Sequence, residues 1–288
     1  MRARKRQFRR HSLAALCLAA GLVPAVAACG PTAEQASARE SAAVSEPPAP
    51  APEPKQARVP AAEPEPPAAP EPMKVTVSGA QAGMAQEVQD ACQPLLREDP
   101  GPVPGNEAAD CVAAAMVAGS GASQTVSTSA SWLPPGTYTM DFRTGETFEM
   151  QLDSADGELG ISVGGGSRTL RTGDARVAAD ASGGPEESYA AVLVDAAELT
   201  ANPQRLGGLV ESGTAAAVEY RVDYQGVQAT RLTAVVEPKN PGDFSGSIVL
   251  TLDELYRPLL IEYAGTTRGI STSIRAEITG WGSSGPLR

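Results

Sequence analysis

The chain has 288 residues, of which 42% are hydrophobic and 4% aromatic, and it carries a formal net charge of −11 at pH 7. Beyond the N-terminal 12 residues it has no basic cluster, so we do not expect it to bind nucleic acid. No stretch after residue 28 approaches the roughly 20 consecutive apolar residues that a membrane-spanning helix needs.

Residues 1–28 have the pattern of a lipoprotein signal peptide. Six basic residues precede an apolar run over 13–26, and the small residues Val26-Ala27-Ala28 then lead into Cys29. In this pattern the Cys29 thiol receives a diacylglyceryl group and its amine becomes the new N-terminus. We therefore expect a lipid anchor at the extracytoplasmic face of the cell membrane. An ordinary signal peptide followed by a cysteine is the alternative, and Arg9-Arg10 leaves the export route open between twin-arginine and general secretory.

Residues 29–73 are predicted to form a disordered tether that begins at the lipidated cysteine. They contain 12 of the chain's 25 prolines, interleaved with Ala and Glu, and no aromatic residue. Such a segment cannot bury enough apolar surface to fold. As extended polyproline it reaches on the order of 100 Å, which suits a spacer; a ligand for a proline-recognising partner is the alternative. Residues 74–288 are then one folded domain.

The four cysteines separate into three groups. Cys17 leaves with the signal peptide, and Cys29 is expected to be acylated, which leaves Cys92 and Cys111 as a pair in an oxidising compartment. We predict a disulfide between them, which closes a loop worth about 3 kcal/mol. A redox-active pair is the weaker alternative, because the spacing is unlike C-x-x-C.

The only histidine, His11, is removed with the signal peptide. The mature protein therefore has no Ser-His-Asp or Cys-His nucleophile and no histidine ligand for zinc or iron. We expect no enzymatic activity, no cofactor and no metal site.

The hydrophobic pattern predicts helices over 80–98 and 106–118, and its period then changes from 3.6 to 2. Two short helices are predicted between 195 and 212, the first with a capping box at Asp195 and Glu198 and the second with Pro203 in its first turn. The expected strands are 138–142, 148–152, 159–163, 175–181, 189–194, 218–224, 227–236, 248–252, 259–263 and 270–281.

About eight to ten antiparallel strands form a sheet too large to stay flat, and its apolar face needs a cover. We therefore predict an α+β fold: a large curled antiparallel β-sheet, or half-barrel, with short helices on its concave side. The helices between 195 and 212 are the expected lid over this face.

The order of these elements behind Cys29 resembles the LprG/LppX-type lipoproteins of actinobacteria. The resemblance covers about 110–281 and includes the Ala-rich helix that ends at Gly119-Ser120, the Asn202-Pro203-x-x-Leu206 segment, Thr230-Arg231 and the terminal Trp281-Gly282. It implies a half-barrel that holds the acyl chains of a lipid or glycolipid and carries them between envelope layers. Two features depart from the family pattern: the additional segment 74–105, and the lack of an aromatic residue at Arg176-Val177-Ala178.

Side chains on a strand alternate between its two faces, so the apolar face of the sheet can be read from the sequence. The residues that we expect to contact the ligand are Tyr138, Met140, Phe142, Phe148, Met150, Leu152, Leu159, Ile161, Leu206, Leu209, Tyr220, Val222, Leu250, Ile261 and Ile274.

Two interpretations remain open. As a lipid carrier, a monomer with a membrane lipid or glycolipid as its partner, the domain needs an apolar cavity with an open mouth. Alternatively, these residues form only the core of a curled sheet, and the protein is a non-enzymatic envelope sensor or interaction module that binds another envelope protein.

Overall fold

The computed structural model describes residues 74–75, 79–238, 240, 243–282 and 287. The predicted signal peptide, the predicted lipidation site Cys29 and the predicted tether lie outside these residues. In the part of the chain that is described, no helix is long and apolar enough to cross a membrane.

Twelve strands form a single sheet within the described residues. They are β1 (Val103–Pro104), β2 (Gly121–Ala130), β3 (Gly136–Thr144), β4 (Phe148–Ser154), β5 (Leu159–Gly164), β6 (Ser167–Thr172), β7 (Ala175–Ala178), β8 (Ala215–Tyr224), β9 (Val227–Val236), β10 (Ser245–Leu252), β11 (Pro258–Thr267) and β12 (Ile270–Trp281).

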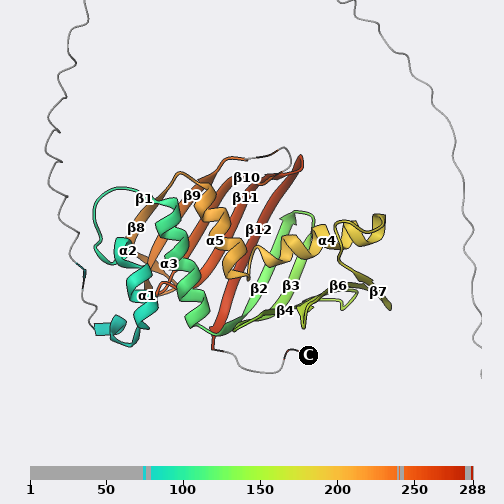
Figure 1. The fold of residues 1–288 in the computed structure, drawn as a ribbon, viewed down its shortest axis with the longest axis horizontal. Helices are drawn as coiled ribbons and strands as arrows, with labels where there is room; N and C mark the ends of the chain where they lie inside the picture. Colours follow the sequence, from blue (N-terminus) through green and yellow to red (C-terminus); the bar gives the residue numbers. More distant parts are fainter. Residues whose placement is uncertain (1–73, 76–78, 239, 241–242, 283–286, 288) are drawn as a thin grey trace, which may run out of the picture. The chain divides into compact units, whose positions relative to one another are not determined.

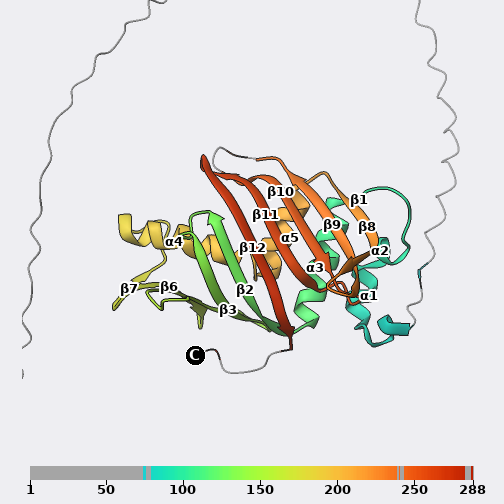
Figure 2. The same cartoon turned by 180° about the vertical axis from the view of Figure 1, so that it is seen from behind.

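The strand order is β1-β8-β9-β10-β11-β12-β2-β3-β4-β5-β6-β7 (Figure 1), and the paired strands run antiparallel throughout. In the described residues β1 and β7 do not pair with each other, so the sheet is open. The helices cover one face of the sheet, and the opposite face is seen from behind in Figure 2. The predicted fold class, a curled antiparallel half-barrel with short helices on the concave side, is confirmed.

The sheet has more strands than the eight to ten predicted. Alternation did not single out β1, β2 and β6. β1 has only two residues, and β2 and β6 are rich in Ser and Thr and carry few large apolar residues. β2 nevertheless lies in the middle of the sheet between β12 and β3. β2 forms backbone hydrogen bonds with both neighbouring strands, so it is held in the sheet although its sequence lacks the alternating large apolar residues of a typical half-buried strand.

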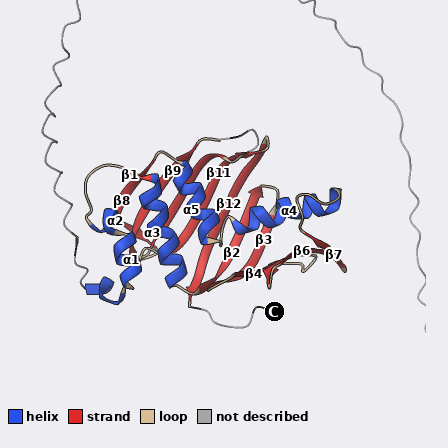
Figure 3. Ribbon diagram, in the orientation of Figure 1, coloured by secondary structure: helices blue, strands red, loops and turns tan. Residues whose placement is uncertain are grey.

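The helices are η1 (Gly79–Gly83), α1 (Gln86–Ala91), α2 (Gln93–Leu96), α3 (Gly105–Ala118), α4 (Pro185–Glu198) and α5 (Pro203–Ser212). Figure 3 shows α3 and α5 side by side over the β8–β12 part of the sheet, with α4 crossing the strands of the other part. α4 contacts β5, β6 and β7. The cover is therefore larger than the predicted lid, because α3 and α4 belong to it as well.

The predicted strand over 189–194 is wrong, because this segment forms the middle of α4. Its buried residues Ala190, Ala191, Leu193, Val194 and Ala197 follow helical spacing, which the Ala-Ala-Val-Leu-Val run conceals in the sequence. The start signals were present: Pro185 occupies the first turn, and the Glu187 side chain accepts a hydrogen bond from the Gly184 N–H. The predicted capping box at Asp195 and Glu198 is wrong for the same reason, because both residues lie in the last turn of this helix.

The predicted helix over 80–98 is divided into η1, α1 and α2, with the break between α1 and α2 at Cys92. Cys92 forms the predicted disulfide with Cys111 of α3, with a Cα–Cα distance of 4.5 Å. The bond attaches the short N-terminal helices to α3, whose predicted extent over 106–118 is confirmed within one residue.

A single hydrophobic core lies between the helices and the concave face. Met140, Leu152, Ile161 and Leu170 are successive partners across β3, β4, β5 and β6, so they form one row on this face. α3 and α5 pack closely, since a Cβ added at Gly207 of α5 would lie 3.6 Å from the Ala109 carbonyl oxygen.

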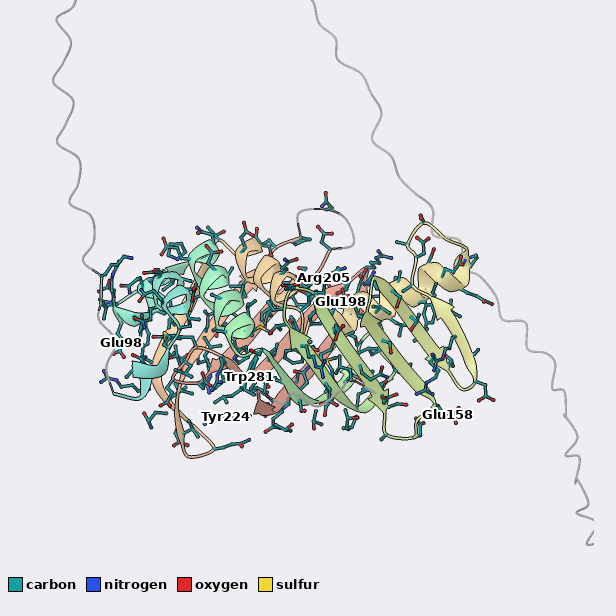
Figure 4. All side chains as sticks on the ribbon, turned by 60° about the horizontal axis from the view of Figure 1, so that its bottom comes forward. Glu98, Glu158, Glu198, Arg205, Tyr224 and Trp281 are labelled. Carbon is teal, nitrogen blue, oxygen red and sulfur yellow. A yellow bond between two sulfur atoms is a disulfide. The ribbon has the colours of Figure 1, made fainter. Side chains whose placement is uncertain are left out.

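The β8–β9 hairpin extends to the outer face of the sheet. A bulge between Glu219 and Val222, with Arg221 at φ 59°, bends it. At its tip the Tyr224 hydroxyl donates to Glu277 Oε1 of β12 at 3.1 Å. The tip approaches Trp281 at the end of β12 in Figure 4. Leu260 pairs with Glu277 and is only 4% exposed, although the register places it on the outer face. The hairpin therefore covers part of that face.

Candidate functional site

The first candidate site is a half-open cavity of about 390 Å³ between α4, α5 and the ends of β9–β12, here called the α4–α5 pocket. It is lined by Ser131, Trp132, Val192, Asp195, Ala196, Leu199, Arg205, Gly208, Leu209, Ser212, Val236, Glu237, Asp243, Phe244, Thr267, Arg268, Thr272 and Ile274.

Much of the α4–α5 pocket wall is apolar. Trp132, Leu199 and Leu209 are half-buried, whereas Phe244 and Ile274 are buried. Exposed Glu237 and Arg268 contribute charge at its solvent-facing side. The pocket thus combines an apolar interior with a polar rim, which suits an amphipathic ligand.

Two adjacent glycines of α5 have different roles. Gly207 faces α3, where it permits the close helix packing described above. Gly208 lines the α4–α5 pocket, and a Cβ added there would meet no atom within 4 Å. The missing side chain at Gly208 therefore helps to keep the pocket open.

Four charged residues form a wall beside the α4–α5 pocket, here called the ion-pair wall: Arg168 of β6, Asp195 and Glu198 of α4, and Arg205 of α5. Arg168 pairs with both carboxylates, and Arg205 Nη2 lies 2.9 Å from Asp195 Oδ1 while its Nε lies 3.0 Å from Glu198 Oε2. Glu198 and Arg205 lie side by side in Figure 4.

The ion-pair wall is balanced in charge. Burial by itself lowers the pKa of the Arg168 guanidinium, but the hydrogen bond that it donates to Asp195 and the charges of Glu198 and Asp195 raise this pKa above its usual value. The Glu198 side chain is only 5% exposed, so removing either arginine would leave a poorly solvated carboxylate. The wall holds α4, α5 and β6 together.

Residues 199–202, here called the elbow, connect α4 to α5 and are held by polar contacts from the sheet. The Tyr263 hydroxyl donates to the Leu199 carbonyl oxygen, and complete burial raises the pKa of Tyr263. Gln124 Nε2 donates to Thr200 Oγ1 at 3.1 Å. The Asn202 side chain caps the N-terminus of α5.

A second cavity, of about 470 Å³, lies on the other side of the ion-pair wall. We name it the turn pocket, because the β3–β4 and β5–β6 turns form much of it. It is lined by Val117, Thr144, Gly145, Glu146, Thr147, Phe148, Val163, Gly164, Gly165, Gly166, Ser167, Arg168, Asn202, Pro203 and Gln204.

The predicted ligand-contacting residues divide into three groups. Leu209 and Ile274 line the α4–α5 pocket, and Phe148 lines the turn pocket. A second group is packed in the core, where each side chain is at most 3% exposed, with half-buried Leu159 beside it. The core group consists of Tyr138, Met140, Phe142, Met150, Leu152, Ile161, Leu206, Leu250 and Ile261.

Tyr220 and Val222 form the third group and lie apart from the others. The bulge at Arg221 interrupts strand parity, so that Val222 pairs with Ala229, whereas Val218 pairs with Leu232. The β9 partners Ala229 and Leu232 are three positions apart and so lie on opposite faces, which places Val222 on the opposite face from Val218. Burial raises the pKa of Tyr220, and the nearby charges of Glu98 and Asp99 raise it further.

The pocket residues that sequence patterns did not select lie in loops or in misassigned segments. Trp132 and Phe244 lie in connections before β3 and before β10, where alternation gives no signal. Val192 lies on α4, which was read as a strand. An aromatic residue in a strand connection, as in Ser131-Trp132-Leu133, is the signal that could have found this site.

No family model matches the sequence, and no curated protein matches it. Solved structures similar to this one include LprF from Mycobacterium bovis, at 12% identity and a TM-score of 0.38, covering 65% of this chain and 98% of that one. Another is an outer membrane lipoprotein-sorting protein domain from Vibrio parahaemolyticus, at 12% identity and a TM-score of 0.30, covering 58% and 86%. Both similarities concern the fold, and neither identifies a ligand, an activity or a partner for this chain.

Proposed function

We propose that this chain is a lipid-anchored envelope protein whose domain binds an acyl chain of a lipid or glycolipid and carries it between envelope layers. The observation that carries the proposal is the half-open, largely apolar α4–α5 pocket beneath the helical cover. Its volume of about 390 Å³ falls in the range of roughly 300–1,000 Å³ that is usual for small-molecule sites.

The distribution of charge supports an amphipathic ligand. Hydrocarbon gains most where water is excluded, at Leu199, Phe244 and Ile274. A polar head group can stay in water at the rim, near Arg268 and Glu237. The ion-pair wall is internally balanced, so it does not require a charged ligand.

A non-enzymatic interaction module is the second candidate, and one observation favours it. Most of the predicted ligand-contacting residues, including Met140, Leu152 and Ile161, are packed in the core rather than open to a cavity. A domain that only binds another envelope protein needs such a closed core, and it would not need the α4–α5 pocket to accept a chain.

The deciding experiment uses a monododecanoylglycerol brominated in its chain, which quenches a tryptophan that it contacts. Trp132 lines the pocket, and Trp281 is the chain's other tryptophan. We expect the lipid to quench the fluorescence of the natural protein. The part of this quenching that is due to Trp132 is the part lost in Trp132→Phe, and we expect Gly208→Phe to lose the same part. Gly145→Phe is the matched control, since it places the same side chain in open space outside this pocket. No quenching of Trp132, or equal quenching in Gly208→Phe, would refute the carrier and favour the interaction module.

The anchor is tested separately at Cys29. We expect Cys29→Ala to be released from the membrane or to accumulate as uncleaved precursor, as followed by partitioning into detergent. Mature Cys29→Ala protein that still partitions into detergent would show a different anchor.

A further inference from the structure

We propose that the turn pocket is a second binding site for an apolar chain, which is filled independently of the α4–α5 pocket. The inference goes beyond the proposed function, because it concerns a different cavity with a different wall. It rests on three features of the described residues: uncovered apolar side chains, a nearly neutral lining, and the ion-pair wall between the two pockets.

The turn pocket exposes apolar side chains that no helix covers. Val117, in the last turn of α3, is 51% exposed, which makes it one of the most exposed large hydrophobic residues of the domain. Phe148 and Val163 are half-buried and belong to the margin of the core. Phe148 also packs against the buried Phe142, with ring centroids 6.5 Å apart. A chain lying on these residues would bury apolar surface that now contacts water.

The lining selects an uncharged group. Its charged members are Glu146 and Arg168, and the Arg168 guanidinium is bound by Asp195 and Glu198 of the ion-pair wall. The other polar members are hydroxyl and amide groups, such as Thr147, Ser167 and Gln204. The site therefore fits a hydrocarbon chain with a neutral polar end better than a fatty-acid anion.

The ion-pair wall separates the two pockets. Arg168 lines the turn pocket, whereas its partner Asp195 and the neighbouring Arg205 line the α4–α5 pocket. A hydrocarbon chain that passed from one pocket to the other would have to break these pairs and leave poorly solvated charges. Two chains, one on each side, leave the wall intact.

The two pockets can be blocked one at a time with the same substitution. An added Cβ meets nothing within 4 Å at Gly145, in the turn pocket, or at Gly208, in the α4–α5 pocket. Gly145→Phe and Gly208→Phe therefore direct a phenyl ring toward open space. Thr147→Phe, on the same turn as Gly145, repeats the first test if Gly145→Phe does not fold.

The experiment is native mass spectrometry of the detergent-free protein with monododecanoylglycerol below its micelle concentration. We expect two bound molecules in the natural protein, one in Gly145→Phe, one in Gly208→Phe and none in the double variant. Circular dichroism checks that each variant is folded.

Each result bears on one pocket. Two results would overturn the second site. In the first, both Gly145→Phe and Thr147→Phe still bind two lipid molecules. In the second, the natural protein never binds more than one molecule and Gly208→Phe binds none. If Gly208→Phe retains everything that the natural protein binds while Gly145→Phe retains nothing, the second site stands and the proposed function at the α4–α5 pocket falls.

Discussion

The two parts of the sheet are covered in different ways. Over β8–β12, here called the braced part, α3 and α5 pack against each other at Gly207, and the Cys92–Cys111 disulfide attaches α1 and α2 to α3. Over β2–β7, here called the spanned part, α4 is the main cover (Figure 1) and contacts β5, β6 and β7, while the end of α3 contacts β3. The face of α4 that is buried contains small residues, including Ala190, Ala191, Ala196 and Ala197.

The cavities that do not lie at the junction of the two parts also differ in size. The α4–α5 pocket and the turn pocket measure about 390 and 470 Å³, and another cavity at the start of α4 measures about 560 Å³. A pocket that borders only the braced part, at Tyr256, measures about 120 Å³. One helix, with a face of alanines, covers less of a wide sheet than two helices and a disulfide do. The turn pocket and the cavity at the start of α4 therefore border the spanned part, whereas the α4–α5 pocket lies where α4 meets α5 and the ends of β9–β12.

The largest expected effect comes from removing the disulfide. The double variant Cys92→Ser/Cys111→Ser should lose about 3 kcal/mol of unfolding free energy, since the loop is no longer closed in the unfolded chain. Urea unfolding measures this loss. Amide hydrogen exchange should accelerate in α1, α2 and α3 and stay nearly unchanged in β3–β6. Equal acceleration of exchange in both parts would contradict the claim that the disulfide stabilises mainly the braced part.

Overpacking compares the two parts directly. Met150 of β4 and Leu250 of β10 are both at most 1% exposed. We expect each tryptophan substitution to cost about 1–3 kcal/mol, with Met150→Trp at the lower end and Leu250→Trp at the upper end. The Met150 partner Val163 borders the turn pocket and can move into it, whereas the Leu250 partners Leu232 and Ile261 are fully buried. Thermal unfolding of Met150→Trp and Leu250→Trp measures both losses of stability. Equal losses would show that the turn pocket does not give the neighbouring core room to relax.

The smallest expected effect concerns the contact that ties the elbow to β11. Tyr263→Phe should cost about 1 kcal/mol, because the Leu199 carbonyl loses its donor. Burial raises the pKa of Tyr263, so its contribution to stability is complete below the unfolded tyrosine pKa, near 10, and declines as the pH rises above it. Tyr263→Phe should therefore flatten the loss of stability above pH 10, as measured by urea unfolding across that range. An unchanged slope would show that Tyr263 is not the titrating group.

Period and parity in the sequence predicted most of the braced part. The α3 and α5 helices and the β8–β12 strands have long alternating or helical runs, and Asn202-Pro203 marks the start of α5. The spanned part was predicted less well, because α4 presents alanines that fit either period. The bulge at Arg221 could not be predicted, because the alternating pattern of 218–224 continues through it without interruption. Its one extra residue, which has a positive φ, moves the side chains that follow it on β8 to the opposite face of the sheet.

The pockets were less predictable than the fold. Each is assembled from segments far apart in the chain, from Trp132 to Ile274 in the α4–α5 pocket. Gly208 contributes to the pocket because it has no side chain. A hydrophobic pattern is made of side chains, so it cannot identify a position whose role is to lack one. Most of the predicted ligand-contacting residues do share one apolar face of the sheet. Whether such residues pack against helices or line a cavity depends on the helices above them, which the strand pattern does not reveal.

The strand order also determines when this domain can fold as its chain emerges from the N-terminus onward, whether from the ribosome or during the proposed export. β12 pairs with β2, so the central seam of the sheet joins residues about 140 to 160 positions apart, from the Ala130–Ser273 pair to the Ala122–Trp281 pair. A chain that is threaded through a membrane with its N-terminus first can form the β2–β7 meander early, but β2 then has an unpaired edge until residues 270–281 have emerged. Pairing over such a separation is slow, and an open edge invites aggregation. A chain that emerges in this order therefore depends on β12 to close the seam, and a truncation that removes β12 would leave two separate meanders rather than a shortened half-barrel.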